Sequence, residues 1–142
     1  MTHRIHVIIL QLTLIILTTA CVPYPVYKTL QPSAVVQVVD DGGHPITDAE
    51  VHLVTHSFFQ HDHPKNRSSK KTASNGVAEF DSQHEWRTEF MALHGAEHLY
   101  WSLCVQSNGF KTYRNSEIKT NKMDVKIKLS IGESTPCIKN QK

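Results

Sequence analysis

The sequence predicts an all-β protein, a single antiparallel β-sandwich of about seven short strands. Three observations indicate this fold. Short segments rich in β-branched residues alternate apolar with polar positions. Clusters of glycine, proline, asparagine and aspartate separate these segments. Beyond the first 20 residues no segment has a clear helical apolar period, and the remaining length suits one domain.

The first two expected strands are separated by a dense turn. "AVVQVVD", residues 34–40, is rich in valine and places Val36 and Val38 on one face. "DDGGHP", residues 40–45, has the glycines and the proline of a tight turn. "AEVHLVTH", residues 49–56, predicts a strand whose core face carries Ala49, Val51, Leu53 and Thr55. We expect the polar stretch from Gln60 to Ser74 to end this strand.

The second half of the chain repeats the pattern. "NGVAEF", residues 75–80, predicts a tight turn and a short strand. Further strands are expected in "TEFMAL", residues 88–93, and in "LYWSLCVQ", residues 99–106. In "LYWSLCVQ" the apolar residues Leu99, Trp101, Leu103 and Val105 share one face, and Cys104 lies on the other. "DVKIKLSI", residues 124–131, predicts the last strand, with Val125, Ile127, Leu129 and Ile131 inward.

The N-terminus has the layout of an export signal. "MTHRIH" carries one fixed positive charge, at Arg4, and leads into "VIILQLTLIIL", in which nine of eleven residues are strongly apolar. A membrane-crossing helix needs roughly 20 apolar residues, and this run is followed by Pro23 and Pro25. We therefore expect residues 1–20 to be a signal peptide.

"LTTAC", residues 17–21, resembles the lipobox of bacterial lipoproteins, with small residues directly before the cysteine. That resemblance implies acylation of Cys21 and cleavage before it, so that acyl chains hold the protein on a bilayer. Residues 21–33, which contain three prolines, are then expected to be a lipidated tether, and residues 34–142 the sandwich domain with a C-terminal tail. Because Val22 is not acidic, the resemblance favours the outer membrane, facing the periplasm. The alternative is an ordinary secretory signal that leaves Cys21 as a thiol.

The two other cysteines, Cys104 and Cys137, are expected to form a disulfide. Export places them in an oxidising compartment, and the simplest interpretation of two cysteines there is that they form a disulfide with each other. Cys137 follows Ile131 by six residues, and extended chain spans about 3.3 to 3.6 Å per residue. The tail is therefore long enough to bring Cys137 to the outer side of the sheet. Two separate reduced thiols are the alternative.

"VVDDGGHPITDAEVHL", residues 38–53, resembles the opening of carboxypeptidase regulatory-like domains. The matching residues, in order, are Val38, Asp40, Gly43, Pro45, Ile46, Ala49 and Val51. "NGVAEF", "NGFKTY" and "DVKIKLSI" match later turns and strands of that family, so the resemblance covers residues 34–131. It implies a sandwich with prealbumin (transthyretin-like) topology. "HGAEHLYWSLCVQSNGF", residues 94–110, also resembles a segment of uncharacterised bacterial lipoproteins that carry such domains. It implies no activity.

Ten histidines invite a search for a metal site. In "HDHP", residues 61–64, His61 and His63 have a spacing that lets two imidazoles approach one zinc or copper ion, with His56 or His84 as further ligands. Because the stretch is a polar loop without a cysteine or glutamate at diagnostic spacing, His61 and His63 are weak candidates. We expect solvated loop histidines and no cofactor.

No catalytic constellation is evident. Ser102 and Cys104 lie on a regular expected strand, and the Gly-x-Ser-x-Gly sequence of a nucleophile elbow does not occur. Trp86 and Trp101 have the aromatic faces that stack on sugars, but we favour the interpretation that they fill a core or an edge. We therefore expect no catalytic residue and no enzymatic activity.

The charge balance argues against nucleic acid as a partner. The chain has 15 basic and 13 acidic residues, with a single short basic stretch, "KNRSSKK". The expected function is a membrane-anchored envelope lipoprotein that acts as a non-enzymatic binding or structural module for an envelope protein or glycan. The alternatives are an inhibitor or immunity lipoprotein that opposes an envelope-attacking enzyme or toxin, and a metal-binding lipoprotein that uses His61 and His63.

Overall fold

The computed structural model describes residues 4–6, 11, 23–58, 64–90 and 97–137. The chain divides into two compact units: residues 1–27 with 86–97, and residues 28–85 with 98–142. Within the described ranges, no helix has both the length and the apolar character needed to span a bilayer.

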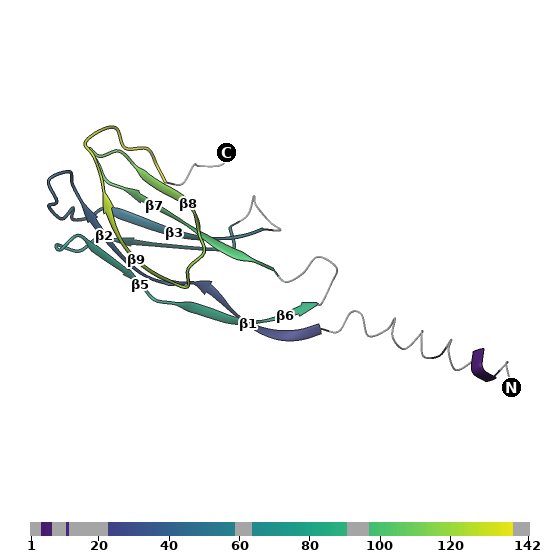
Figure 1. Ribbon diagram of the computed structural model, residues 1–142. Coiled ribbons are helices and arrows are strands. Elements are labelled where there is room, and N and C mark those ends of the chain that lie inside the picture. Colours follow the sequence, from purple (N-terminus) through teal and green to yellow (C-terminus); the bar gives the residue numbers. More distant parts are fainter. Residues whose placement is uncertain (1–3, 7–10, 12–22, 59–63, 91–96, 138–142) are drawn as a thin grey trace. The chain divides into compact units, whose positions relative to one another are not determined.

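The described part of the chain is built from strands, which confirms the predicted all-β class (Figure 1). It contains nine strands where about seven were expected: β1 (Pro23–Gln31), β2 (Ser33–Val39), β3 (Glu50–Ser57), β4 (Asn66–Lys71), β5 (Val77–Phe80), β6 (Gln83–Phe90), β7 (Leu99–Gln106), β8 (Tyr113–Ile118) and β9 (Lys122–Lys128).

Two sheets of the second unit form the sandwich. One has three strands in the order β5-β2-β9, and the other has four strands in the order β4-β3-β7-β8. The pairs within the four-stranded sheet are antiparallel, as expected, and so is β2 with β5. Strands β2 and β9 run parallel, which differs from the purely antiparallel prediction. Strands β1 and β6 make a separate two-stranded ribbon that passes through both units.

The core lies between the two sheets and uses the predicted apolar stripes. Its residues come from both sheets: Ala34, Val36, Val38, Ile46, Ala49, Val51, Leu53, Ala78, Phe80, Trp101, Leu103, Val105, Met123, Ile127 and Leu129. Ile131 was expected to face inward and is instead 81% exposed. The reason is that β9 ends before it, and Ile131 makes only an isolated bridge with Phe110 where the chain turns.

The predicted Asn75–Gly76 turn is present, and it requires glycine. Gly76 has a φ of 73°, and a Cβ there would lie 2.6 Å from the Val38 carbonyl oxygen. The close approach exists because the Val38 amide donates a hydrogen bond of 2.8 Å to the Gly76 carbonyl. The turn thus connects to the edge of β2 as well as starting β5.

The polar stretch expected to be loop contains β4, which pairs with β3 along six residues. Strand β8 was not expected either, and β4 and β8 are the outermost strands of the four-stranded sheet. An outermost strand with polar side chains lacks the apolar alternation that sequence patterns detect, and its charges discourage pairing with other chains.

The expected tether differs from the structure over Pro23–Gln31, because this segment is β1 and pairs with β6. Its final residues belong to the second unit. The Leu30 carbonyl accepts hydrogen bonds from Thr55 Oγ1 and, at 3.0 Å, from Trp101 Nε1. Gln31 is buried and donates to the Asp81 carbonyl at 2.7 Å.

Candidate functional site

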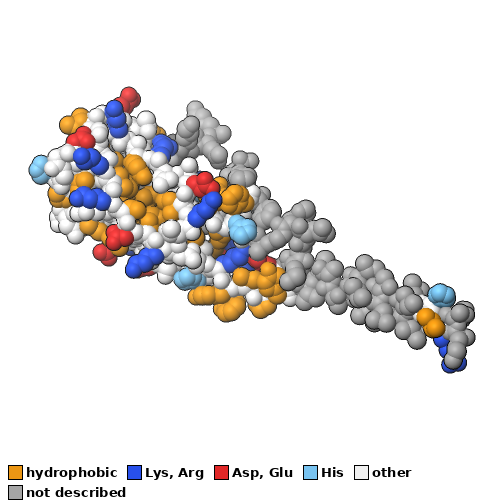
Figure 2. Space-filling model, viewed as in Figure 1, with side chains coloured by type: hydrophobic (Ala, Val, Ile, Leu, Met, Phe, Trp, Pro, Cys, Tyr) orange, Lys and Arg blue, Asp and Glu red, His pale blue; other side chains and the backbone are white. Residues whose placement is uncertain are grey.

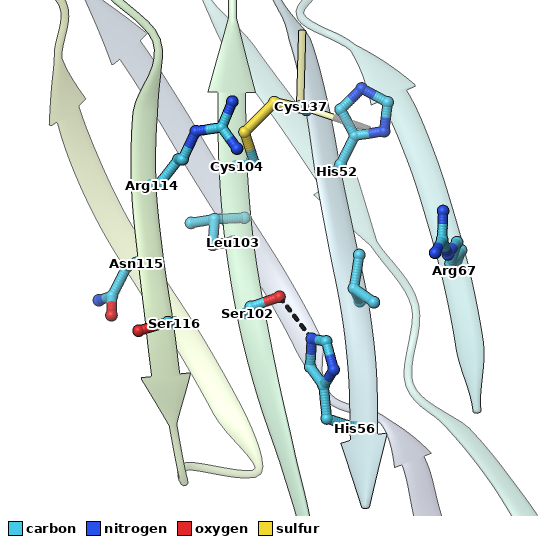
Figure 3. Close-up of a pocket in the computed structure, with 11 residues that line it drawn as sticks. His52, His56, Arg67, Ser102, Leu103, Cys104, Arg114, Asn115, Ser116 and Cys137 are labelled. Carbon is cyan, nitrogen blue, oxygen red and sulfur yellow. Dashed lines mark hydrogen bonds between the residues drawn. A yellow bond between two sulfur atoms is a disulfide. The ribbon is translucent and has the colours of Figure 1, made fainter. Parts of the chain in front are cut away.

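A groove lies on the outer face of the four-stranded sheet, the face turned away from the core. Its volume is about 340 Å³. Figure 3 shows side chains of β3, β4, β7 and β8 around it, together with the C-terminal tail. The described residues that line it are His52, Val54, His56, Arg67, Ser102, Leu103, Cys104, Arg114, Asn115, Ser116 and Cys137.

Strand alternation and register assemble this lining. On β3, the residues His52, Val54 and His56 alternate with the buried core stripe, and so face the other way. The register pairs His52 with Cys104 and Val54 with Ser102 on the neighbouring β7. The outermost strands extend the same two rows, because Arg67 pairs with Val54 and Arg114 pairs with Cys104.

The C-terminal tail forms one wall of the groove. Cys104 and Cys137 lie at disulfide distance, with the sulfurs 2.01 Å apart and the Cα atoms 5.8 Å apart. Arg114 Nη2 donates to the Pro136 carbonyl at 2.8 Å, and Thr112 Oγ1 donates to the Thr135 carbonyl at 2.6 Å. The tail therefore lies against β8 and reaches across it to β7.

His56 and Ser102 form a polar pair inside the groove. His56 Nε2 lies 2.8 Å from Ser102 Oγ, a hydrogen bond whose direction depends on the imidazole tautomer (Figure 3). The His56 ring also stacks on Tyr100, with the centroids 5.1 Å apart and the planes 17° apart. These contacts orient the imidazole on a rigid strand.

His52 is the most enclosed polar residue of the groove, with 6% of its surface exposed. Its Nε2 lies 3.3 Å from Glu50 Oε1, but within the described ranges no atom meets hydrogen-bond geometry with this nitrogen. A hydrogen bond weakens steeply when it is bent, so Glu50 does not satisfy this nitrogen despite the short distance. A buried ring nitrogen without a hydrogen bond is energetically costly, so His52 keeps capacity for a further polar contact.

Two arginines give the groove its positive charge, and the carboxylate of Glu50 lies next to one lining residue, 3.3 Å from His52 Nε2. The described lining of the groove includes two arginines and two histidines, and neither aspartate nor glutamate is among these residues. Arg114 is occupied with the tail. Arg67 is exposed, and in the described part of the chain its guanidinium has no hydrogen-bond or ion-pair partner. A groove of this kind attracts carboxylate or phosphate groups, which arginine binds in a bidentate manner.

The predicted site residues fall into two groups. The structure brings Cys104 and Cys137 together, whereas Cys21, His61 and His63 lie outside the described residues. Of the further metal ligands considered, His56 contacts Ser102 and His84 Nδ1 lies 3.2 Å from Thr29 Oγ1. Across the described ranges, no group of three or more His, Cys, Asp or Glu residues is arranged to hold a metal ion.

The two tryptophans have different environments. Trp101 is 4% exposed and lies in the core, as one of the two interpretations expected. Trp86 is 71% exposed and does not belong to the core.

The sequence pattern missed the two arginines of the groove. Arg67 and Arg114 could not be placed, because their strands β4 and β8 were not predicted. A signal for the histidines did exist: the alternation of β3 places His52 and His56 together on the side opposite the core stripe.

Comparisons with known proteins add no relative, since no protein-family model, curated protein or solved structure matches this chain.

Proposed function

We propose that the protein is an envelope lipoprotein anchored through acylated Cys21, and that it acts as a non-enzymatic binding module. Its groove on the four-stranded sheet accepts a ligand or partner through a carboxylate or phosphate group. The observation that carries this proposal is the groove itself. It combines Arg67, whose guanidinium has no partner among the described residues, and the enclosed His52 with a described lining that contains no carboxylate.

The anchor is supported by the N-terminal sequence. A short apolar run and small residues precede Cys21, and a lipid-held protein needs no membrane-crossing helix. The outer membrane, with the domain in the periplasm, is the proposed location because Val22 is not acidic. Loss of labelled palmitate on Cys21→Ser tests the anchor, and equal labelling of variant and parent would reject it.

The domain family is part of the proposal. The order of matching turns and strands from residue 34 to residue 131 supports a carboxypeptidase regulatory-like domain of prealbumin-like topology. Fold does not by itself imply an activity, so this family assignment adds none to the proposal.

An enzymatic role is the competing interpretation of the pair formed by His56 and Ser102. Ser102 lies in the middle of β7 and shares a hydrogen bond with His56 across the sheet, so its hydroxyl is held by strand geometry and does not project from a turn. The neighbouring Cys104 is joined to Cys137. Treatment with a fluorophosphonate probe should leave Ser102 unmodified, and specific labelling of Ser102 would contradict the non-enzymatic proposal.

Titration with small anions tests the groove. The mature protein in detergent is titrated with inorganic phosphate and separately with acetate at constant ionic strength. Calorimetry and NMR monitor each titration. We expect shifts at the amides of His52 and Ser102. Arg67→Gln should weaken binding about tenfold or more, because a charge-assisted hydrogen bond contributes roughly 1.5 to 3 kcal/mol.

Lys126→Gln is the matched control, because Lys126 is also an exposed cation on a strand but belongs to the three-stranded sheet. It should leave anion binding unchanged. Equal weakening by both substitutions would mean that only net charge matters and would reject the groove as a site.

An envelope enzyme that binds the parent protein and loses activity on binding would instead favour the inhibitor alternative.

A further inference from the structure

An exposed aromatic pair lies on the ribbon formed by β1 and β6. Trp86 is 71% exposed and Tyr27 is 58% exposed, and their ring centroids are 5.1 Å apart. The other tryptophan, Trp101, is buried in the core at 4%. A large indole left in solvent beside a second exposed ring calls for a partner surface.

The pair belongs to a wider apolar surface. Along the start of β1, every second residue is exposed: Pro23, Pro25 and Tyr27. Because alternate residues of a strand point to the same side, these three residues share one face. Figure 2 shows apolar side chains gathered at the surface in this part of the chain. The ribbon thus presents prolines and two amphipathic aromatics together.

The chemistry of the pair favours a lipid surface. Tryptophan and tyrosine combine an apolar ring with a polar N–H or O–H, and they concentrate at the interface between hydrocarbon and water. A sugar ring is better served by a flat aromatic platform, whereas the Tyr27 and Trp86 planes are inclined by 46°. The two rings therefore suit the irregular headgroup layer better than a pyranose face.

The position of the pair along the chain supports the same partner. Tyr27 follows Cys21 by six residues, so fully extended chain keeps the two Cα atoms within about 20 Å. If Cys21 carries acyl chains, this short distance keeps the start of β1 near the headgroup region. This step rests on the proposed anchor.

We propose that Tyr27 and Trp86 form an interfacial contact with the bilayer, which seats the β1–β6 ribbon in the headgroup layer. The acyl chains supply the affinity, and the aromatic pair fixes how the ribbon meets the membrane. The two tryptophans make this testable, because Trp86 is exposed and Trp101 is enclosed.

The test reconstitutes the mature acylated protein into phosphatidylcholine–phosphatidylglycerol vesicles that contain lipids brominated near the headgroup. The Trp86 share of the emission should shift to shorter wavelength and be quenched. Trp86→Phe should lose the quenched component, since the remaining Trp101 lies in the core. Tyr27→Ser should reduce the quenching, whereas Ile131→Ser, which changes an apolar residue that is 81% exposed elsewhere, should not.

Two failures can be separated. If palmitate labels Cys21 and the chain sediments with vesicles while Trp86 emission stays unquenched, the interfacial contact is overturned and the anchor stands. If neither labelling nor sedimentation occurs, the anchor fails and this inference fails with it. If Trp86 emission does not change with lipid but shifts when purified peptidoglycan is added, the inference is overturned in favour of a glycan contact.

Discussion

The two sheets of the sandwich share one core but differ at their outer faces. On the three-stranded sheet, Val35 lies between Glu79 and Asp124 in an open row of exposed side chains. On the four-stranded sheet, the row of His52 and Cys104 is enclosed by the tail, and His52 is almost fully buried. In both sheets, apolar core residues alternate with residues of the outer face. This alternation distinguishes the core face of a strand from its outer face, but it does not show which of the two outer faces forms a site.

The difference arises from the tail that follows β9. It leaves the three-stranded sheet, passes along β8 and reaches Cys104 on β7. The outer face of the four-stranded sheet therefore gains a wall, and a row of ordinary strand residues becomes a groove. One disulfide, between Cys104 and the tail residue Cys137, is thus enough to make the outer face of one sheet a candidate binding surface.

Removal of the disulfide should have the largest effect on this difference. With 33 residues of sequence separation, the chain-entropy estimate for replacing Cys104 and Cys137 by serine is a loss of about 3 to 4 kcal/mol in the free energy of unfolding. Urea unfolding without reductant measures the loss. The fold should survive, because neither cysteine belongs to the core cluster.

Dithiothreitol provides the control for this prediction. It should lower the stability of the parent toward that of the double variant and leave the variant unchanged. Identical unfolding curves for the non-reduced parent and the variant would show that the tail contributes no constraint.

A charge placed on each outer face should sharpen the comparison next. Val54→Lys sets an ammonium beside Arg67 on a half-buried strand position, and we expect a loss of about 1 to 2 kcal/mol. Val35→Lys faces Glu79 and Asp124 across the neighbouring strands, so the change should stay within about 0.5 kcal/mol. Thermal unfolding of both variants decides the matter, and equal losses would mean that the two faces are equivalent.

The hydrogen bonds of the tail should contribute less. Arg114→Gln weakens contacts of 2.8 Å to the Pro136 carbonyl and 3.3 Å to Thr135 Oγ1, with an expected cost of about 1 kcal/mol. Reduction of the bond between Cys104 and Cys137 without denaturant should become faster, because the tail opens more often. Lys126→Gln, on the other sheet, should reduce at the parent rate, and an unchanged rate in Arg114→Gln would contradict the wall formed by the tail.

Sequence reasoning succeeded where a strand has one buried face. Strands β2, β3, β7 and β9 carry clear apolar stripes, and most of their core residues were identified. Ile131 was wrongly expected to face inward, and the buried Met123, just before the expected start of the last strand, was missed. The Cys104 position was informative for the same reason, since it stood opposite the stripe of its strand. These predictions depend on side-chain burial, which the order of apolar and polar residues records directly.

Sequence reasoning failed where a strand carries no alternating apolar stripe. Asn66–Lys71 is polar throughout, and its hydrogen bonds to β3 hold it in the sheet. Without β4 and β8 the two arginines had no place, and the groove could not be assembled from sequence. The parallel pairing of β2 with β9 is equally invisible, because alternation is the same for both strand directions.

The smallest expected effect concerns the turn that joins the two sheets, where Asp40 accepts a hydrogen bond of 2.8 Å from the His44 amide. This bond, aided by the His44 ring, lowers the pKa of Asp40 below its ordinary value of 3.8. A lowered carboxyl pKa stabilises the fold above the unfolded value, and the stabilisation is lost as pH falls through the lower folded value. Asp40→Asn should therefore unfold at a slightly lower temperature than the parent at neutral pH, and the gap should close on acidification below the ordinary carboxyl range. Because Asp40 belongs to neither outer face, anion binding should be unaffected. Melting curves collected across the acid range measure the gap, and a gap that persists or widens at low pH would show that the Asp40 charge does not stabilise this turn.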